Sequence, residues 1–113
     1  MTLFFTMTLS AYQISCGQTI TSNTVLSGDI TCTAGLTINA NNISLDGAGY
    51  TIFMSNTASA INMFNKTGVT IKNLTVVYTG STGTAMNFSS ITNSLIENNN
   101  ISNATHGMRL NGT

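Results

Sequence analysis

The feature that most constrains the fold of this 113-residue chain is a repeat of short alternating segments. The first segment recurs at residues 35–40, 60–65, 85–90 and 107–112, and apolar residues alternate with polar ones in every copy. This alternation is the pattern of a strand that is buried on one face. Aligning the copies gives two apolar columns with spacings of 25, 25 and 22 residues: Leu36, Ile61, Met86 and Met108, and then Ile38, Met63, Phe88 and Leu110.

A second and a third segment recur with a similar period. The second occupies residues 43–47, 69–73 and 94–98 and aligns Leu45, Ile71 and Ile96, and the third aligns Ile52, Val76 and Ile101. A βαβ crossover needs at least about 10–12 residues with helical periodicity between parallel strands, and the sequence contains no such stretch. We therefore predict an all-β parallel β-helix, a solenoid of about three coils plus a partial fourth, in which like residues stack on like residues.

Three consecutive asparagines in "NSLIENNNIS" (93–102) interrupt this pattern between two strand-like flanks. Asn98 aligns with Asn73 in "TIKNLTV" and with Gly47 in "SLDGAGYTI". Asparagine and glycine are the residues that tolerate a left-handed backbone conformation at little cost. We therefore predict that Gly47, Asn73 and Asn98 form a structural bend between the second and third strands, with asparagine amides bonding from coil to coil.

Charged residues are few, at 5 % of the chain, and the formal net charge is zero, so the sequence carries no electrostatic signature of nucleic-acid binding. Asp46, Lys72 and Glu97 follow Leu45, Ile71 and Ile96 and fall into one outward row. We interpret this row as a surface charge ladder worth about 0.2–1 kcal/mol per pair. The alternative is a catalytic or metal-binding role. The lysine would neutralise two carboxylates that could otherwise hold a calcium ion, whereas Asp46 and Glu97, two coils apart, could meet the separation of about 5–9.5 Å of a glycosidase pair by accident.

Other candidate sites are weaker. His106 has no second imidazole with which to share a metal, and we interpret it as a solvated turn residue. Met86 and Met108 could form a thioether copper site, but methionine more often fills a gap in an apolar core. Among the N-x-S/T sequons, Asn87 and Asn111 are expected to point outward and are the best candidates for glycosylation, although the sequons could also be an accident of composition. We predict no catalytic residues, no metal ligands and no cofactor.

The segments "NNISLDGAGYTI", "GVTIKNLTVV" and "NSLIENNNIS" resemble the repeats of right-handed parallel β-helix proteins of the pectin-lyase-like superfamily. Residues 15–38, "SCGQTITSNTVLSGDITCTAGLTI", resemble the two-cysteine N-terminal cap of archaeal and bacterial surface members, some of them NosD-like. The resemblance covers roughly residues 14–113 and implies a right-handed solenoid. It implies little about activity, because this fold hosts lyases, hydrolases, epimerases, adhesins and plain scaffolds.

Both ends of the chain lead to expectations. Residues 1–13 resemble a degenerate secretory leader, with a first strand as the alternative, and their apolar run is too short to span a membrane. Residues 14–34 are expected to form the cap. A disulfide between Cys16 and Cys32 is expected if the protein is exported, with a value of about 3 kcal/mol, whereas two buried thiols are expected if it is cytosolic. Residues 35–113 stop within a strand, so we expect further coils or a partner to cover that edge.

These observations predict a non-catalytic structural or adhesive scaffold of a secreted or cell-surface protein. The expected partners are carbohydrate, through weak contacts, or another cell-surface protein, and not nucleic acid. The alternative is the N-terminal section of a polysaccharide lyase or glycoside hydrolase whose catalytic coils lie beyond residue 113.

Overall fold

The computed structural model describes residues 14–112, and in this part of the chain every regular element is a β-strand. The strands have only two to six residues, because turn residues interrupt the alternation of apolar and polar residues after each short segment. Because no helix occurs among these residues, none is long and apolar enough to cross a membrane. The strands are β1 (Thr19–Ile20), β2 (Thr24–Val25), β3 (Ile30–Cys32), β4 (Leu36–Ile38), β5 (Ser44–Asp46), β6 (Thr51–Met54), β7 (Ile61–Phe64), β8 (Thr70–Lys72), β9 (Thr75–Tyr78), β10 (Thr84–Ser89), β11 (Leu95–Glu97), β12 (Asn100–Ser102) and β13 (His106–Asn111).

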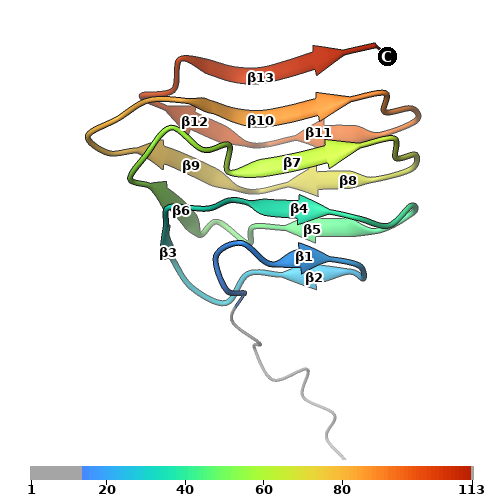
Figure 1. The fold of residues 1–113 in the computed structure, drawn as a ribbon. Coiled ribbons are helices and arrows are strands. Elements are labelled where there is room, and N and C mark those ends of the chain that lie inside the picture. Colours follow the sequence, from blue (N-terminus) through green and yellow to red (C-terminus); the bar gives the residue numbers. More distant parts are fainter. Residues whose placement is uncertain (1–13, 113) are drawn as a thin grey trace, which may run out of the picture.

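The strands form three parallel sheets, each of which takes one strand from every full coil, and the first sheet also contains β13 (Figure 1). Sheet A has the order β1-β4-β7-β10-β13, sheet B the order β2-β5-β8-β11 and sheet C the order β3-β6-β9-β12. The chain therefore passes from A to B to C and returns to A one layer further along the stack. The prediction of an all-β parallel solenoid is confirmed, and the stack has about four turns.

The register of the strands confirms the columns that the sequence predicts. In sheet A, Leu36 pairs with Ile61, Ile61 with Met86 and Met86 with Met108. In sheet B, Leu45 pairs with Ile71 and Ile71 with Ile96, and in sheet C, Ile52 pairs with Val76 and Val76 with Ile101. The apolar period of the sequence therefore sets the layer spacing of the solenoid.

The segment 14–34, which the sequence predicts to be a cap, contributes a strand to each of the three sheets. Strands β1, β2 and β3 pair in parallel with β4, β5 and β6. The segment therefore forms a first full coil in addition to holding the two cysteines. The repeat pattern misses this coil because β1 and β2 have only two residues each, which is too short to show an alternation.

The core is a single apolar column enclosed by the three sheets, and among the described residues the hydroxyl of Tyr78 is the one hydroxyl, amide or charged group on a buried side chain. Inward positions of the middle coils are fully buried, because each of these coils is covered by a coil on both sides. Burial of this kind supplies most of the stabilisation, at about 25 cal/mol per Å² of apolar surface.

The three corners of the coil differ in length. The chain turns from sheet A to sheet B through residues 21–23 in the first coil and then through residues 39–43, 65–69 and 90–94, which are segments of equal length. The turn from B to C has four residues in the first two coils, at 26–29 and 47–50, and two in the next two, at 73–74 and 98–99. The turn from C back to A varies most, from residues 55–60 to 79–83 and 103–105.

Candidate functional site

The charged row on the outer face of sheet B has the order that the sequence predicts. Asp46 pairs with Lys72, and Lys72 pairs with Glu97, so that acid, base and acid lie in successive coils. The row continues to Val25 of β2, which is paired with Asp46 and is 58 % exposed. The placement of the three charges is observed, and their stabilising role as a charge ladder stays a prediction.

The carboxylate of Asp46 also has a local structural task. It accepts a hydrogen bond from the backbone N–H of Ala48 at 2.8 Å and one from Nδ2 of Asn73, in the next coil, at 3.2 Å. A carboxylate that accepts such bonds stabilises the turn around it. Asp46 is therefore linked to the corner between sheets B and C, while Lys72 and Glu97 have no such contact in the described structure.

The bend predicted at the asparagines is confirmed. Asn73 and Asn98 both have φ at 55°, in the left-handed region, and each begins the two-residue corner between sheets B and C. Two further corner columns share this conformation: Asn42, Gly68 and Asn93 in one, and Asn65, Ser90 and Gly112 in the other. Corners that require positive φ thus account for part of the abundance of asparagine, since six of the 15 asparagines have this conformation.

Gly47 lies in the predicted corner, but the prediction that it adopts the left-handed conformation is wrong. The left-handed residues of that corner are Ala48, with φ at 52°, and Gly49, with φ at 83°, whereas Gly47 is not in the left-handed region. Glycine is required at position 47 because of close packing: a Cβ there would lie 2.4 Å from the carbonyl oxygen of Asn73 and 2.5 Å from Cα of Leu74. The two extra residues of this corner shift the left-handed conformation along the chain, which alignment with Asn73 and Asn98 alone does not reveal.

Asn99, which the alignment of the repeats does not distinguish from its neighbours, connects two coils through both atoms of its side-chain amide. Its Oδ1 accepts from the backbone N–H of Leu74 at 3.0 Å, and its Nδ2 donates to the carbonyl oxygen of Ile71 at 3.0 Å. The middle asparagine of "NNN" therefore completes the backbone hydrogen bonding of the preceding corner. Its place after the left-handed Asn98 is the signal that could have identified it.

Side chains at other corners act in the same way. The backbone N–H groups of Ser44, Thr67 and Thr51 donate to Oδ1 of Asn23, Asn41 and Asp29, each at 2.8–2.9 Å and each in the preceding coil. At a corner the backbone leaves the sheet, so these donors would otherwise face water or the coil below without a partner. Short polar side chains thus continue the hydrogen-bond ladder around the coil.

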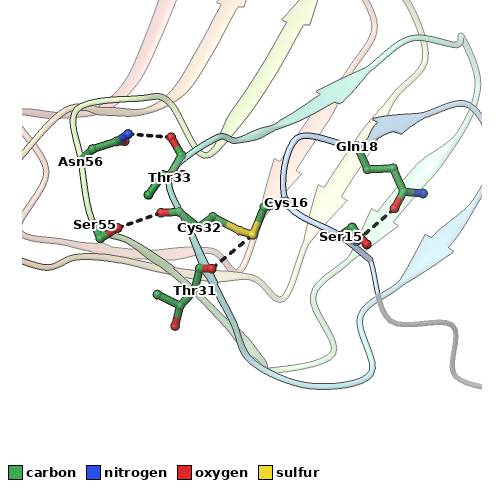
Figure 2. The surroundings of a disulfide bond; sticks show 8 residues. All are labelled: Ser15, Cys16, Gln18, Thr31, Cys32, Thr33, Ser55 and Asn56. Atoms are coloured by element: carbon green, nitrogen blue, oxygen red, sulfur yellow. Dashed lines mark hydrogen bonds between the residues drawn. A yellow bond between two sulfur atoms is a disulfide. The ribbon is translucent and has the colours of Figure 1, made fainter.

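The two cysteines form the disulfide that the sequence predicts for an exported chain (Figure 2). Cys16 is exposed and lies before β1, whereas Cys32 is buried at the end of β3, and their Cα atoms are 5.4 Å apart. The next coil is hydrogen-bonded to the chain beside the disulfide. Oγ of Ser55 donates to the carbonyl oxygen of Cys32, and Nδ2 of Asn56 donates to the carbonyl oxygen of Thr33. The disulfide therefore fixes the start of the described chain to the first coil.

Tyr78 connects two successive corners between sheets C and A. Its hydroxyl donates to the carbonyl oxygen of Ala58 at 2.6 Å, and the carbonyl oxygen of Thr84 lies 3.1 Å away. Burial raises the pKa of this phenol, because the charged form would lose its hydration. The residue has the properties of a buried structural hydroxyl.

The outer face of sheet A carries a row of uncharged polar side chains that ends in a cation. Thr37 pairs with Asn62, Asn62 with Asn87 and Asn87 with Arg109. The side-chain amides of Asn62 and Asn87 are half-buried and have no hydrogen bond within the described structure. The two strands that carry these free amides are about 4.8 Å apart. Each amide can donate and accept hydrogen bonds on this face.

The remaining sequence candidates lie apart from one another. His106 is exposed at the start of β13, and Met108 is 44 % exposed although its column neighbour Met86 is buried. Residues 14–112 contain no group of three or more His, Cys, Asp or Glu side chains that could hold a metal ion. Of the two proposed glycosylation sites, Asn87 is half-buried within β10 and Asn111 is exposed at the end of β13. The leader predicted at 1–13 lies outside the described residues.

No protein-family model, curated protein or solved structure matches this chain. The class of protein is therefore defined by its fold alone, as a disulfide-linked parallel β-solenoid.

Proposed function

We propose that this chain is a non-catalytic structural or adhesive scaffold of a secreted or cell-surface protein. The observation that supports this best is the coil-to-coil bonding, in which side chains at the corners between sheets A and B and between sheets B and C continue the hydrogen bonding of the strands. A stack held in this way is a stiff element with long flat faces. Its repeats resemble those of the pectin-lyase-like superfamily and of NosD-like surface proteins, which we propose as its relatives.

The free amide row of sheet A is the proposed contact surface for carbohydrate. Amide groups pair well with sugar hydroxyls, since each amide offers two donors and an acceptor. Only Asn62 and Asn87 contribute free amides to this row, so we expect weak contacts, in keeping with adhesion rather than tight binding. The neutral net charge of the chain favours an uncharged partner.

The proposed extracellular location rests on the disulfide. A disulfide persists in oxidising compartments and is rare in the cytosol, and the exposed position of Cys16 would leave it open to reduction there. Production of the chain with its own residues 1–13, followed by fractionation, tests this proposal. We expect oxidised protein outside the cell, and reduced protein in the cytosol would contradict the location.

Binding to insoluble polysaccharides tests the contact surface. We expect weak retention on at least one neutral polysaccharide, with loss of retention in the variant Asn62→Ala/Asn87→Ala. The matched control is Ser44→Ala/Thr70→Ala, which removes two polar outward side chains from adjacent strands of sheet B instead. Equal retention of the two variants would place the contact elsewhere.

An activity assay tests whether the described coils are themselves catalytic, which is a narrower question than the enzyme alternative, whose catalytic coils would lie beyond residue 113. Within the described coils, Asp46 and Glu97 would act as the acid pair, two strands and about 10 Å apart in sheet B, with Lys72 between them. We expect no release of unsaturated or reducing ends from pectin, cellulose or chitin. Release of such products that disappears in Asp46→Asn/Glu97→Gln would overturn the non-catalytic assignment.

A further inference from the structure

One outward residue of sheet A is unlike its polar neighbours. Phe64, the last residue of β7, is 44 % exposed, although the row in which it lies continues with Ser89 of β10. Contact of this exposed benzyl side chain with an apolar surface would remove part of it from water, which is favourable. The next residue along the chain, Asn65, is a position that can carry such a surface.

Asn65 begins the sequence Asn65-Lys66-Thr67, which has the form of an N-glycosylation acceptor. It lies in the corner after β7, is exposed, and has φ at 54°. Its backbone is held in place, since its N–H donates to the carbonyl oxygen of Ser89 at 2.9 Å. Its side-chain amide has no hydrogen bond in the described structure, so nothing in the fold prevents the nitrogen from carrying a substituent.

The other sequons are less suited to a glycan in the folded protein. The Nδ2 atoms of Asn73 and Asn103 donate to Asp46 and to the carbonyl oxygen of Tyr78. The side chain of Asn42 lies against Gly68, where its Oδ1 would be 2.2 Å from an added Cβ. Asn87 has a paired residue on either side, in β7 and β13.

Two sequons remain besides Asn65. Asn100 is exposed, but it lies within β12 and its sequon ends in Ser102 rather than in a threonine. Asn111 is exposed, but its sequon ends at Thr113, outside the described residues. Neither of them has an exposed aromatic residue next to it in the sequence. Asn65 is therefore the sequon that combines a side-chain amide without a hydrogen bond and a neighbouring exposed aromatic ring.

We propose that Asn65 is an N-linked glycosylation site and that the first sugar ring packs on the exposed ring of Phe64. In this reaction a lipid-diphosphate-linked oligosaccharide is the donor. A bond forms between Nδ2 of Asn65 and C1 of the first sugar, the C1–O bond to the diphosphate breaks, the lipid diphosphate leaves, and the amide nitrogen loses one proton to the transferase. The apolar face of the sugar then covers part of Phe64. This inference rests on the export that the proposed function includes.

Secretion from a eukaryotic host behind a standard secretion signal tests the site independently of the chain's own leader. Enzymatic removal of the glycan in heavy-oxygen water converts an occupied asparagine to labelled aspartate, which peptide mass spectrometry locates. We expect the label at Asn65 in the wild type, its loss in Asn65→Gln, and its retention in the control Asn39→Gln, an exposed asparagine outside any sequon. Secreted, oxidised protein with unlabelled Asn65 would overturn the site while leaving the scaffold proposal intact.

The packing on Phe64 has a separate readout. Trimming the glycan to its first sugar should leave the midpoint of thermal unfolding unchanged, whereas complete removal should lower it. In Phe64→Ala the trimmed and bare forms should differ less than they do in the wild type, and this comparison also controls for the aspartate that complete removal creates. Equal midpoints for the trimmed and bare forms of the wild type would overturn the packing of the sugar on Phe64.

Discussion

The two outer strands of sheet A differ sharply although they share one column. Ile20 in β1 and Leu110 in β13 are at the ends of the column that also contains Ile38, Met63 and Phe88. Ile20 is 2 % exposed, whereas Leu110 is 52 % exposed. Both strands have only one partner strand in the sheet, so the strand position does not explain the difference.

The difference comes from what lies over each end. At the β1 end, Ile14 precedes the first coil and is buried in the same apolar cluster as Ile20, and the disulfide holds the nearby Cys16 in place. The described residues provide nothing comparable over β13, and Met108 is exposed as well. In a solenoid, an apolar side chain is therefore buried by the next layer rather than by its own strand, and each layer depends on its neighbours.

Substitutions in the shared column should show this dependence most strongly. Phe88→Ala should reduce the free energy of unfolding by about 3–5 kcal/mol, because Phe88 is fully buried and its removal leaves a cavity. Leu110→Ala, at the exposed end, should change it by less than about 1 kcal/mol. Urea denaturation of both variants gives the comparison, and similar losses would contradict the layered account.

Removal of the disulfide should make the N-terminal end resemble the C-terminal end. The variant Cys16→Ala/Cys32→Ala should lose roughly 3 kcal/mol, the value for a loop of about 15 residues. Hydrogen exchange should accelerate at β1, β2 and β3 and remain unchanged at β11 and β12. Uniform acceleration over the whole stack would instead show that the coils unfold as one unit.

A smaller effect should come from the corner between sheets B and C. Asn99→Ala should cost about 1–2 kcal/mol, because the N–H of Leu74 and the carbonyl of Ile71 lose their partners. Asn98→Gly is the matched control, since glycine adopts the same left-handed conformation at little cost, and it should change stability by a few tenths of a kcal/mol. Chemical denaturation distinguishes the two, and an equal cost would contradict the bridging role of Asn99.

The smallest effect should come from the charged row. Glu97→Gln should reduce stability by about 0.2–1 kcal/mol, because Glu97 is exposed and its pairing with Lys72 is screened by solvent. The loss should vanish at high salt. A loss that persists at 1 M salt, where the Debye length is about 3 Å, would point to a role other than charge pairing.

The sequence predicted the fold well where residues repeat, and less well where a coil departs from the repeat. The columns through Leu45 and Ile52 were readable because a period-2 pattern recurs every 25 residues or so. The first coil has no readable repeat, because β1 and β2 have only two residues each. The role of Gly47 cannot be predicted from the alignment, since close packing against Asn73 is a tertiary constraint without a local signature.

For the candidate sites, the sequence predicts which residues share a row but not which hydrogen bonds their side chains form. Alignment placed Asp46, Lys72 and Glu97 in one row, but it could not show that the carboxylate of Asp46 accepts hydrogen bonds from its own corner. Nor could it separate Asn99 from its neighbours in "NNN", because three identical side chains differ only in the backbone conformation beneath them. The exposure of Phe64 likewise depends on a strand end, which the alternation pattern does not locate.

The neighbour-only pairing of the strands has a mechanical consequence. Each coil of the described chain is hydrogen-bonded only to the coil before it and the coil after it. A force applied along the stack from its ends should therefore peel coils away one at a time. With a repeat of about 25 residues, each event would release about 80–90 Å of extended chain, so the protein would lengthen under load in regular steps.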